Sequence, residues 1–265
     1  MRRFVVIVLG LLVLTGIGLA VLRPSVLKSA GDRVIRLVGR FDPDLSTRMR
    51  DRTVRPLSER LAEKGLGLGS PAFIRVFKQE SELEVWLLRD GVFARFETCP
   101  ICAWSGELGP KLAEGDRQAP EGFYAVGLKQ LNPNSNYHRA FNLGFPNAYD
   151  WALGRTGSFL MVHGDCVSVG CYAMTDQGID EIYRIVEAAL RQGQREVPVH
   201  AFPFRMTGTA LAEKAGHRWA AYWANLKQGY DLFEQTRTPP PAFVCGRRYG
   251  FASPATEGCE AVRAW

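Results

Sequence analysis

The feature that most constrains the fold is a series of short apolar runs that begins near residue 73. Residues 73–77, 83–87 and 92–96 are rich in Val, Ile, Leu, Phe and Trp, and Asp90-Gly91 lies between the last two runs. An Asp-Gly pair in this position is a strong signal for a β-hairpin. Similar runs at 123–126, 141–143 and 159–162 predict further strands. With 265 residues and 46% hydrophobic composition, the chain can build one sizeable, strand-rich core.

Two helical segments and two polar loops accompany these strands. Residues 176–190 place apolar side chains at helical spacing and are followed by Gly193, which predicts a helix. Residues 210–234 predict a second helical region. Its aromatic side chains are expected to pack against the sheet, although an aromatic stripe also suits a ligand surface. The loops at 105–122 and 132–138 are long and polar, which is typical of functional or disordered segments.

Residues 4–22 form an uncharged apolar run, with Arg2 and Arg3 before it and Arg23 after it. Its 19 residues would make a helix about 28 Å long, close to the hydrocarbon thickness of a bilayer. The length favours an uncleaved signal anchor at 1–22, whereas the small residues Gly18 and Ala20 fit a cleaved signal peptide. Both interpretations stay open at this point.

The net charge of +6 is concentrated next to this run. Residues 1–64 contain 13 of the 33 Lys and Arg and 6 of the 27 Asp and Glu, so they carry +7 and the rest of the chain −1. Nucleic-acid binding by the folded part is therefore not expected, because it would need a basic patch there. The excess fits the anionic head groups of the cytoplasmic membrane. Six cysteines beside an export segment indicate an oxidising compartment, so we expect a periplasmic protein, anchored to the inner membrane or exported with a cleaved signal.

The chemistry is expected in residues 161–174. His163 follows a predicted strand, and Cys171 lies in a Gly-preceded turn before a helix, as in a thiolate nucleophile site. An imidazole titrates near neutral pH and can take the thiol proton as general acid/base. Gly170 lets the backbone approach an oxyanion, and Ser168 can orient a neighbour by a hydrogen bond.

This segment resembles the signature of L,D-transpeptidases of the YkuD type, through His163-Gly164 and the Ser168-x-Gly170-Cys171 sequence. The Pro-x-Gly-aromatic entry at 120–123 agrees with it. Within the family, residues 100–109, 131–135 and 163–176 resemble the YafK-like branch. The resemblance implies an α+β fold, a strand-rich YkuD-like β-sandwich with a capping helix and a helical C-terminal extension. It divides the chain into an Arg-rich membrane-proximal helical spacer at 23–70, a catalytic domain at 71–206 and the extension at 207–265.

The resemblance also implies cysteine-dependent acyl transfer on peptidoglycan stem peptides in cell wall remodelling. Cys171 would attack a carbonyl of meso-diaminopimelate, His163 would protonate the leaving amine, and a thioester would form. An amine acceptor would complete a transfer, whereas water would complete a hydrolysis, as in amidase members that cleave amide links at diaminopimelate. We expect no metal or other cofactor, and the oligomeric state stays open.

Two departures from the family pattern affect the expected site. Only four residues separate His163 from Ser168, fewer than in most of the family, and Ala173 stands where many members have an arginine. His138 and His200 are reserve bases, while His217 is expected at the surface. Arg205 is the first candidate to replace the missing substrate-binding arginine because it follows a predicted strand. The other candidates for substrate contact are Arg139, Arg117, Lys111 and Tyr172.

Three alternatives to the enzyme interpretation come from the cysteines and from the departures. Cys99 and Cys102 have the C-x-x-C spacing of redox proteins, but a polar loop follows them rather than a helix. Zinc binding by Cys99, Cys102, Cys166 and Cys171 would quench the nucleophile. A murein-binding module without turnover is a third possibility.

Among disulfides, Cys245–Cys259 is the best pair, and Cys99–Cys102 and Cys102–Cys166 are both possible.

Overall fold

The computed structural model describes residues 55–251 and 258–265, and its folded unit runs from Leu57 to Trp265. The expected membrane segment at 1–22 and most of the spacer at 23–70 lie outside the described residues. Within the described ranges, no helix is both long and apolar enough to cross a bilayer. From the spacer, the structure describes the helix α4 (Leu57–Glu63), whose Leu57 and Leu61 are buried in the main core.

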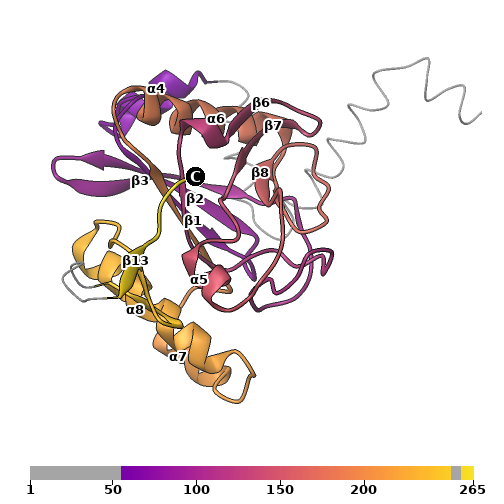
Figure 1. Ribbon diagram of the computed structural model, residues 1–265. Coiled ribbons are helices and arrows are strands. Elements are labelled where there is room, and N and C mark those ends of the chain that lie inside the picture. Colours follow the sequence, from indigo (N-terminus) through magenta and orange to yellow (C-terminus); the bar gives the residue numbers. More distant parts are fainter. Residues whose placement is uncertain (1–54, 252–257) are drawn as a thin grey trace, which may run out of the picture. The chain divides into compact units, whose positions relative to one another are not determined.

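Two five-stranded sheets form the body of the molecule (Figure 1). Sheet A contains, in spatial order, β3 (Val92–Pro100), β2 (Glu82–Arg89), β1 (Ala72–Phe77), β10 (Val197–Phe202) and β5 (Gly122–Val126). Sheet B contains β4 (Ala103–Trp104), β9 (Tyr172–Ala173), β8 (Met161–His163), β7 (His138–Asn142) and β6 (Leu131–Ser135). Only the pairs β1–β10 and β8–β9 are parallel among these strands.

Sheet A is covered on both faces, which explains why all six residues of β1 are buried. Ile74 and Val76 face the main core that sheet A shares with sheet B. Phe73 and Phe77 face the opposite way, toward the C-terminal helices. The hairpin predicted around Asp90-Gly91 is confirmed, because β2 and β3 pair antiparallel across that turn.

The helix α6 (Asp176–Arg191) closes the core between the two sheets. The Thr175 side chain caps its first turn by accepting a hydrogen bond from the Gly178 amide at 3.1 Å. Its apolar face, which includes Ile179, Ile182 and Val186, is fully buried against β1, β7, β8 and β10. This is the capping helix that the sequence predicts at 176–190.

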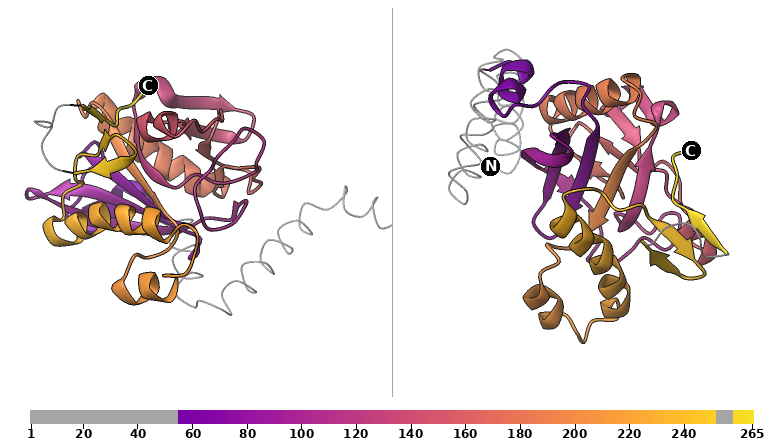
Figure 2. Two further views of the ribbon diagram at one scale, coloured as in Figure 1. Left: turned by 60° about the horizontal axis from the view of Figure 1, so that its bottom comes forward. Right: turned by 90° about the vertical axis from the view of Figure 1, so that its left-hand side faces the viewer.

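The C-terminal segment differs in detail from the single helical region expected at 210–234. It forms α7 (Gly208–Glu213) and α8 (Ala220–Thr236), with turns around Gly216 between them. In the left view of Figure 2, α8 lies alongside the purple strands of sheet A. A third sheet follows, sheet C, made of β12 (Arg248–Gly250), β11 (Phe243–Cys245) and β13 (Cys259–Ala261).

One expected loop is largely a hairpin. Strands β6 and β7 occupy most of residues 132–138, where the sequence predicts a polar loop. Because β6 is an edge strand whose residues stay partly or fully exposed, it carries no apolar pattern that would mark it. The remaining described elements are short: a 3₁₀ turn, η1 (Leu128–Gln130), and the helix α5 (Ala148–Ala152). The mixed sheets with separate helices confirm the predicted α+β class.

Candidate active site

The parallel pair β8–β9 places His163 and Cys171 on one face of sheet B. His163 pairs with Ala173, and Val162 pairs with Tyr172. Alternate residues of a strand project to the same face, so Cys171, two residues before Ala173, projects to the face that carries His163. Tyr172 points the other way, is fully buried, and donates from its hydroxyl to the Pro120 carbonyl at 2.5 Å.

Residues 164–170, which join these two side chains, are held at several points. Cys166 forms a disulfide with Cys102, whose backbone N–H donates to Ala173. The Asp165 amide donates to the Asp176 carboxylate at 2.8 Å. Asp165 and Cys166 both have left-handed backbone angles, with φ of 66° and 47°. Such angles are unfavourable for residues other than glycine, so the loop depends on these cross-links.

The imidazole of His163 has a defined tautomer. Its Nδ1 lies 2.6 Å from the Gly164 carbonyl oxygen, and because that oxygen can only accept, Nδ1 carries the proton. Nε2 therefore presents a lone pair. The ring is 2% exposed and packs against Tyr137, with ring centroids 4.8 Å apart. Burial lowers the pKa of His163, although the Gly164 hydrogen bond and the charge of Asp165 oppose this shift. The resting imidazole is neutral and suited to accept a proton.

The Cys171 thiol is partly buried and donates to the Phe159 carbonyl, with sulfur and oxygen 3.6 Å apart. Burial raises the pKa of Cys171, whereas a hydrogen bond from the Met161 backbone and the charge of Lys111 act in the opposite direction. The resting sulfur is thus a thiol, not a thiolate. A thiol of this kind requires a base before it can react as a nucleophile, and His163 presents its Nε2 lone pair on the same face of sheet B.

Ser168 and Gly170 shape the turn that carries the nucleophile. The Ser168 hydroxyl donates to the Cys171 carbonyl at 2.8 Å and accepts from the Gly170 amide at 3.2 Å. Gly170 has a φ of 126°, a conformation that explains the glycine at this position. A side chain there would approach Leu160 at 3.3 Å. Ser168 therefore acts on Cys171 through the backbone of the turn.

Of the predicted substrate cations, Lys111 is the one whose charge reaches Cys171. It is 3% exposed, and its ammonium group donates to the Ala113 carbonyl at 2.8 Å and pairs with Asp116 at 2.5 Å. Arg117 is exposed, in a left-handed conformation on the loop before β5. Arg139 pairs with Asp180 at 3.1 Å on the β7 side of the His163 loop.

Arg205 lies elsewhere. It pairs with Glu82 and Glu84 on the face of sheet A that α8 covers, and its guanidinium sits over the Phe77 ring. Both sheets separate this face from the face of Cys171. The structure therefore does not bring Arg205 together with His163 and Cys171.

The other histidines have other partners, and His138 lies beside Gly164, which follows His163 in the chain. His138 is partly exposed and contacts Asp180 at 3.0 Å. His200 is 2% exposed among the rings of Phe73 and Phe123, on the α8 side of sheet A, and burial lowers its pKa strongly. His217 is exposed, as expected, in the turn between α7 and α8.

The disulfides show which of the possible cysteine pairs form. Cys102 pairs with Cys166 and Cys245 pairs with Cys259, while Cys99 is buried in β3 as a thiol. The C-x-x-C pair is thus not formed, and its cysteines lie at the end of a strand, not before a helix. Among the described residues, no three His, Cys, Asp or Glu side chains gather into a metal-binding group.

A groove of about 500 Å³ opens beside the nucleophile, on the outer face of sheet B. Two of its lining residues, Phe159 and Met161, also contact Cys171 through their backbone. The groove is lined by Lys129, Gln130, Leu131, Asn132, Asn142, Phe159, Met161 and Trp265. We call this feature the groove below.

Comparison with known proteins assigns the chain to a family. Residues 71–228 match the family model named YkuD, the L,D-transpeptidase catalytic domain. The chain belongs to the YkuD family of L,D-transpeptidase catalytic domains. The matched region starts at the predicted boundary, residue 71, and continues into α8, beyond residue 206. The family assignment made from His163, Ser168, Gly170 and Cys171 is therefore confirmed.

Individual relatives of this YkuD-family chain agree with the assignment. It is 48% identical over 187 residues to the "Putative L,D-transpeptidase YafK" of Escherichia coli strain K12, covering 71% of this chain and 76% of the relative. The same values hold for the protein of that name in E. coli O157:H7. Among solved structures, the helical cell shape determining protein Pgp2 from Campylobacter jejuni is 22% identical with a TM-score of 0.41, over 68% of this chain and 64% of that one. Bd1075 of Bdellovibrio bacteriovorus is 15% identical with a TM-score of 0.37, over 73% and 91%.

Several parts of the site were not predicted from the sequence. The Phe159 carbonyl and the Met161 amide are backbone groups, which no residue type reveals. Tyr137 lies in the segment expected to be a loop and carried no signal for its contact with His163. Trp265 reaches the groove from the far end of the sequence.

Proposed function

We propose that the protein carries out cysteine-dependent acyl transfer on peptidoglycan stem peptides that contain diaminopimelate. The observation that carries this proposal is the neutral pair on one face of sheet B. The His163 Nε2 lone pair is free of hydrogen bonds within the described part of the chain, and the Cys171 thiol contacts the backbone of Phe159, a residue that lines the groove. The family supports the reaction class, and the match to YafK supports a peptidoglycan substrate.

In the first half-reaction, the Cys171 thiol turns from the Phe159 carbonyl and passes its proton to His163 Nε2. The sulfur attacks the carbonyl carbon of the substrate amide, and the C–N bond breaks as the imidazolium returns the proton to the leaving amine. The products are a thioester and a free amine. The Gly170 amide already donates to Ser168, so it would exchange that partner to bind the oxyanion.

In the second half-reaction, the neutral His163 takes a proton from the acceptor as it attacks the thioester. The C–S bond breaks, and the imidazolium returns the proton to the Cys171 sulfur, which restores the thiol. A diaminopimelate amine as acceptor gives a new cross-link, whereas water gives a hydrolysed stem peptide. Hydrolysis at diaminopimelate, for example release of a murein-attached protein, is the second candidate because both outcomes use the same thioester and differ only in this acceptor.

The test is product analysis of purified muropeptides incubated with the full chain and with Cys171→Ala. A new diaminopimelate cross-link that requires Cys171 would establish transfer, and release of an attached amine without a cross-link would establish hydrolysis. Mass spectrometry after carbapenem exposure gives a separate readout, since a reactive Cys171 should carry the adduct. No product and no adduct would show a murein-binding module without turnover. Turnover of a model disulfide that needs Cys102 but not Cys171 would show redox chemistry instead.

We further propose that the enzyme works in the periplasm, with residues 1–22 as signal anchor or signal peptide and 23–70 as a membrane-proximal spacer. The support is the peptidoglycan-acting family, together with the two disulfides, which persist in oxidising compartments. Fractionation of cells followed by N-terminal sequencing would test both parts. An intact N-terminus in the membrane fraction is expected for an anchor, and a cytoplasmic location would contradict the proposal.

A further inference from the structure

The groove beside Cys171 has one wall that comes from outside the matched domain. Seven of its lining residues lie between 129 and 161, but Trp265 comes from the segment after β13. Figure 1 shows this yellow segment rising from β13 to the end marked C. The matched domain, residues 71–228, therefore supplies the nucleophile, while a later part of the chain contributes to the groove.

Residues 262–265 are held in place by their backbone and by Arg263. The Trp265 amide donates to Gln130 Oε1 at 3.0 Å, which fixes it to the floor of the groove. Glu196 accepts from the Ala264 amide at 3.0 Å and pairs with Arg263 at 3.1 Å. Upstream, the Val262 amide donates to Ala242, and the Cys245–Cys259 disulfide ties β13 to β11.

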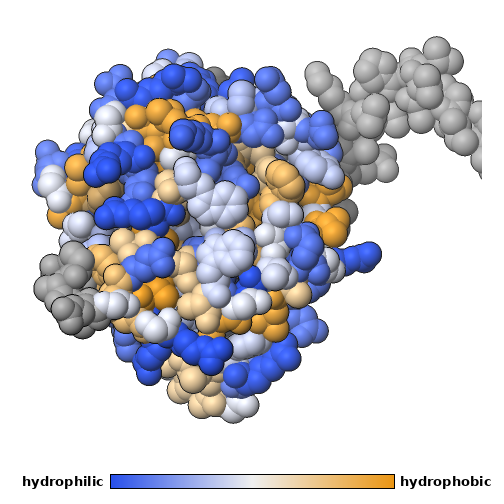
Figure 3. Space-filling model, in the orientation of Figure 1, coloured by the Kyte–Doolittle hydropathy of each residue, from blue (hydrophilic) through white to orange (hydrophobic). Residues whose placement is uncertain are grey.

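The indole of Trp265 is 55% exposed although its backbone is held so firmly. A tryptophan contributes most when its flat apolar face is covered, and here the groove leaves that face to a ligand. On the face drawn in Figure 3, hydrophobic residues lie in separate patches between hydrophilic ones. Trp265 adds an aromatic side chain to a groove that Leu131, Phe159 and Met161 also line.

The polar lining of the groove indicates the chemistry of that ligand. It holds three neutral amide side chains, one cation and no carboxylate. Gln130 uses its amide within the protein, because its Nε2 donates to Ala125 and Asn142 carbonyls. The side-chain oxygens of Asn132 and Asn142 accept from nearby amides, which leaves their NH₂ groups as donors for ligand carbonyls. Lys129 can meet one carboxylate.

We propose that residues 262–265 complete the substrate site, with Trp265 packing against a bound stem peptide and Lys129 binding one of its carboxylates. The stem peptide would run from Cys171 past Met161 toward Gln130. Trp265 is then a positioning residue that acts on substrate affinity and not on the chemical step. This inference rests on the proposed function for the class of substrate.

The experiment measures binding of a diaminopimelate-containing tetrapeptide to the full chain in a Cys171→Ala background, by calorimetry. Adding Trp265→Ala should raise the dissociation constant about tenfold, and Trp265→Phe in its place should keep most of the wild-type affinity. Trp151→Ala is the matched control, because Trp151 is 64% exposed on α5 and does not line the groove. It should leave the dissociation constant unchanged.

A second variant tests the anchoring without touching the groove. Glu196→Ala removes the acceptor of Ala264 and the partner of Arg263, so it should weaken binding several-fold while circular dichroism stays unchanged. Lys129→Met should weaken binding of the free-acid tetrapeptide more than binding of its amidated form.

The results separate this inference from the proposed function. Equal dissociation constants for the Trp265→Ala and Trp151→Ala proteins would overturn the inference, even if the wild-type enzyme forms cross-links. Tighter binding by Trp265→Ala would also overturn it and would identify residues 262–265 as an inhibitory strap. Conversely, tetrapeptide binding that depends on Trp265 in a chain without turnover or carbapenem adduct would support the site and contradict the acyl-transfer proposal.

Discussion

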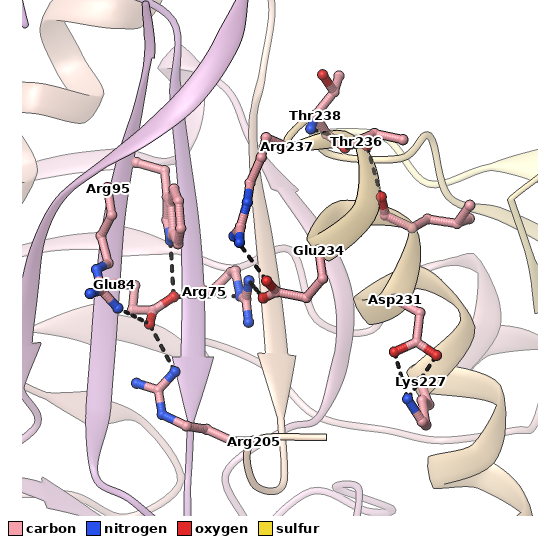
Figure 4. A network of polar contacts seen from close by, with 12 residues as sticks. Arg75, Glu84, Arg95, Arg205, Lys227, Asp231, Glu234, Thr236, Arg237 and Thr238 are labelled. Atoms are coloured by element: carbon pink, nitrogen blue, oxygen red, sulfur yellow. Dashed lines mark hydrogen bonds and ion pairs between the residues drawn. The ribbon is translucent and has the colours of Figure 1, made fainter. Parts of the chain in front are cut away.

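The outer faces of the two sheets both carry polar side chains, but these side chains differ in how many partners they have within the protein. On sheet A, Glu84 accepts from Arg95, Arg205 and Trp86, and Glu234 pairs with Arg75 and Arg237 (Figure 4). On sheet B, His163 Nε2 has no such partner within the described residues, and Cys171 has weak contacts with the Phe159 carbonyl and the Met161 backbone. The charges of the first face are satisfied by one another, although Arg75 Nε and His200 Nδ1 there make no hydrogen bond within the described ranges. The second face leaves its imidazole and its thiol without a charged partner among the described residues.

The difference follows from what covers each face. Sheet A is covered by α8, so a charge such as that of Arg75, 1% exposed, would be costly without a partner. Burial alone would raise the pKa of Glu84, but Arg75 and Arg205 hold it below its ordinary value. The outer face of sheet B opens onto the groove. The cluster of paired charges thus belongs to a structural network, whereas the candidate site holds an imidazole and a thiol beside an open groove.

The largest effect is expected for replacement of Cys171. We expect Cys171→Ala to lower kcat at least about 10⁴-fold, because the covalent route is removed. The measurement is turnover of a muropeptide substrate. Cys99→Ala is the matched control, since Cys99 is the other cysteine outside the disulfides and should retain most of the activity. Equal losses in the two variants would contradict the role of Cys171.

The next largest effect concerns His163. His163→Asn should lower kcat about 10²- to 10⁴-fold, the usual contribution of a general acid/base. Because burial lowers the pKa of His163, its neutral form persists below the ordinary histidine value of about 6.5. The wild-type rate should therefore rise with pH through a midpoint below about 6.5. A pH–rate profile checks this, and an acid limb that survives in His163→Asn would assign the titration to another group.

On the satisfied face, we expect loss of stability without loss of chemistry. Glu84→Gln should reduce the free energy of unfolding by about 3 kcal/mol, because it leaves buried guanidinium groups short of charge compensation. Since the pKa of Glu84 is depressed, its contribution is present above the ordinary glutamate value of about 4.3 and is lost as pH falls through the folded value.

Urea unfolding at pH 7 and at acidic pH would measure this effect on Glu84→Gln. Its kcat at a temperature where it is folded should stay within about twofold of wild type, because both sheets separate it from Cys171. A large drop in kcat with unchanged stability would make the arginine network part of the site and remove the contrast between the faces.

A smaller effect is expected for the Cys102–Cys166 disulfide. The double variant Cys102→Ser/Cys166→Ser should lower kcat about tenfold, because the loop between His163 and Cys171 loses a cross-link and misplacement of reacting groups slows the chemistry. Cys245→Ser/Cys259→Ser is the matched control for kcat at saturating substrate, because that disulfide supports residues 262–265, which act on affinity and not on the chemical step. Both proteins should be compared at a temperature where circular dichroism shows them folded.

Local patterns carried much of what could be predicted. The hairpin at Asp90-Gly91 and the helix at 176–191 follow from short-range signals, namely turn chemistry and apolar periodicity, and both are present. The edge strand β6 was missed because an exposed strand has no buried face to shape its sequence. The split between α7 and α8 falls at residues 214–218, where polar residues and Gly216 interrupt the apolar spacing, a local signal that the prediction of one helical region did not use.

Arg205 shows where such reasoning ends. Its position after a strand made it the first candidate for the substrate cation, but the structure surrounds it with Glu82 and Glu84. An arginine in an ion-pair network and an arginine in a binding site look the same in the sequence, so only the neighbouring residues in the structure distinguish them. Lys111, a later candidate in the sequence analysis, is by contrast the cation whose charge acts on Cys171.

The family could be assigned from the sequence alone, because a histidine, a glycine and a cysteine within nine residues can be recognised without knowing the rest of the fold. The sequence also determined the strand-rich class through alternation and turns. Only the tertiary structure decided which cysteine joins Cys102 across 64 residues, which cations are already paired, and that Trp265 lies beside Gln130, 135 residues away. Such contacts depend on how distant segments pack, and no local spacing in the chain records that packing.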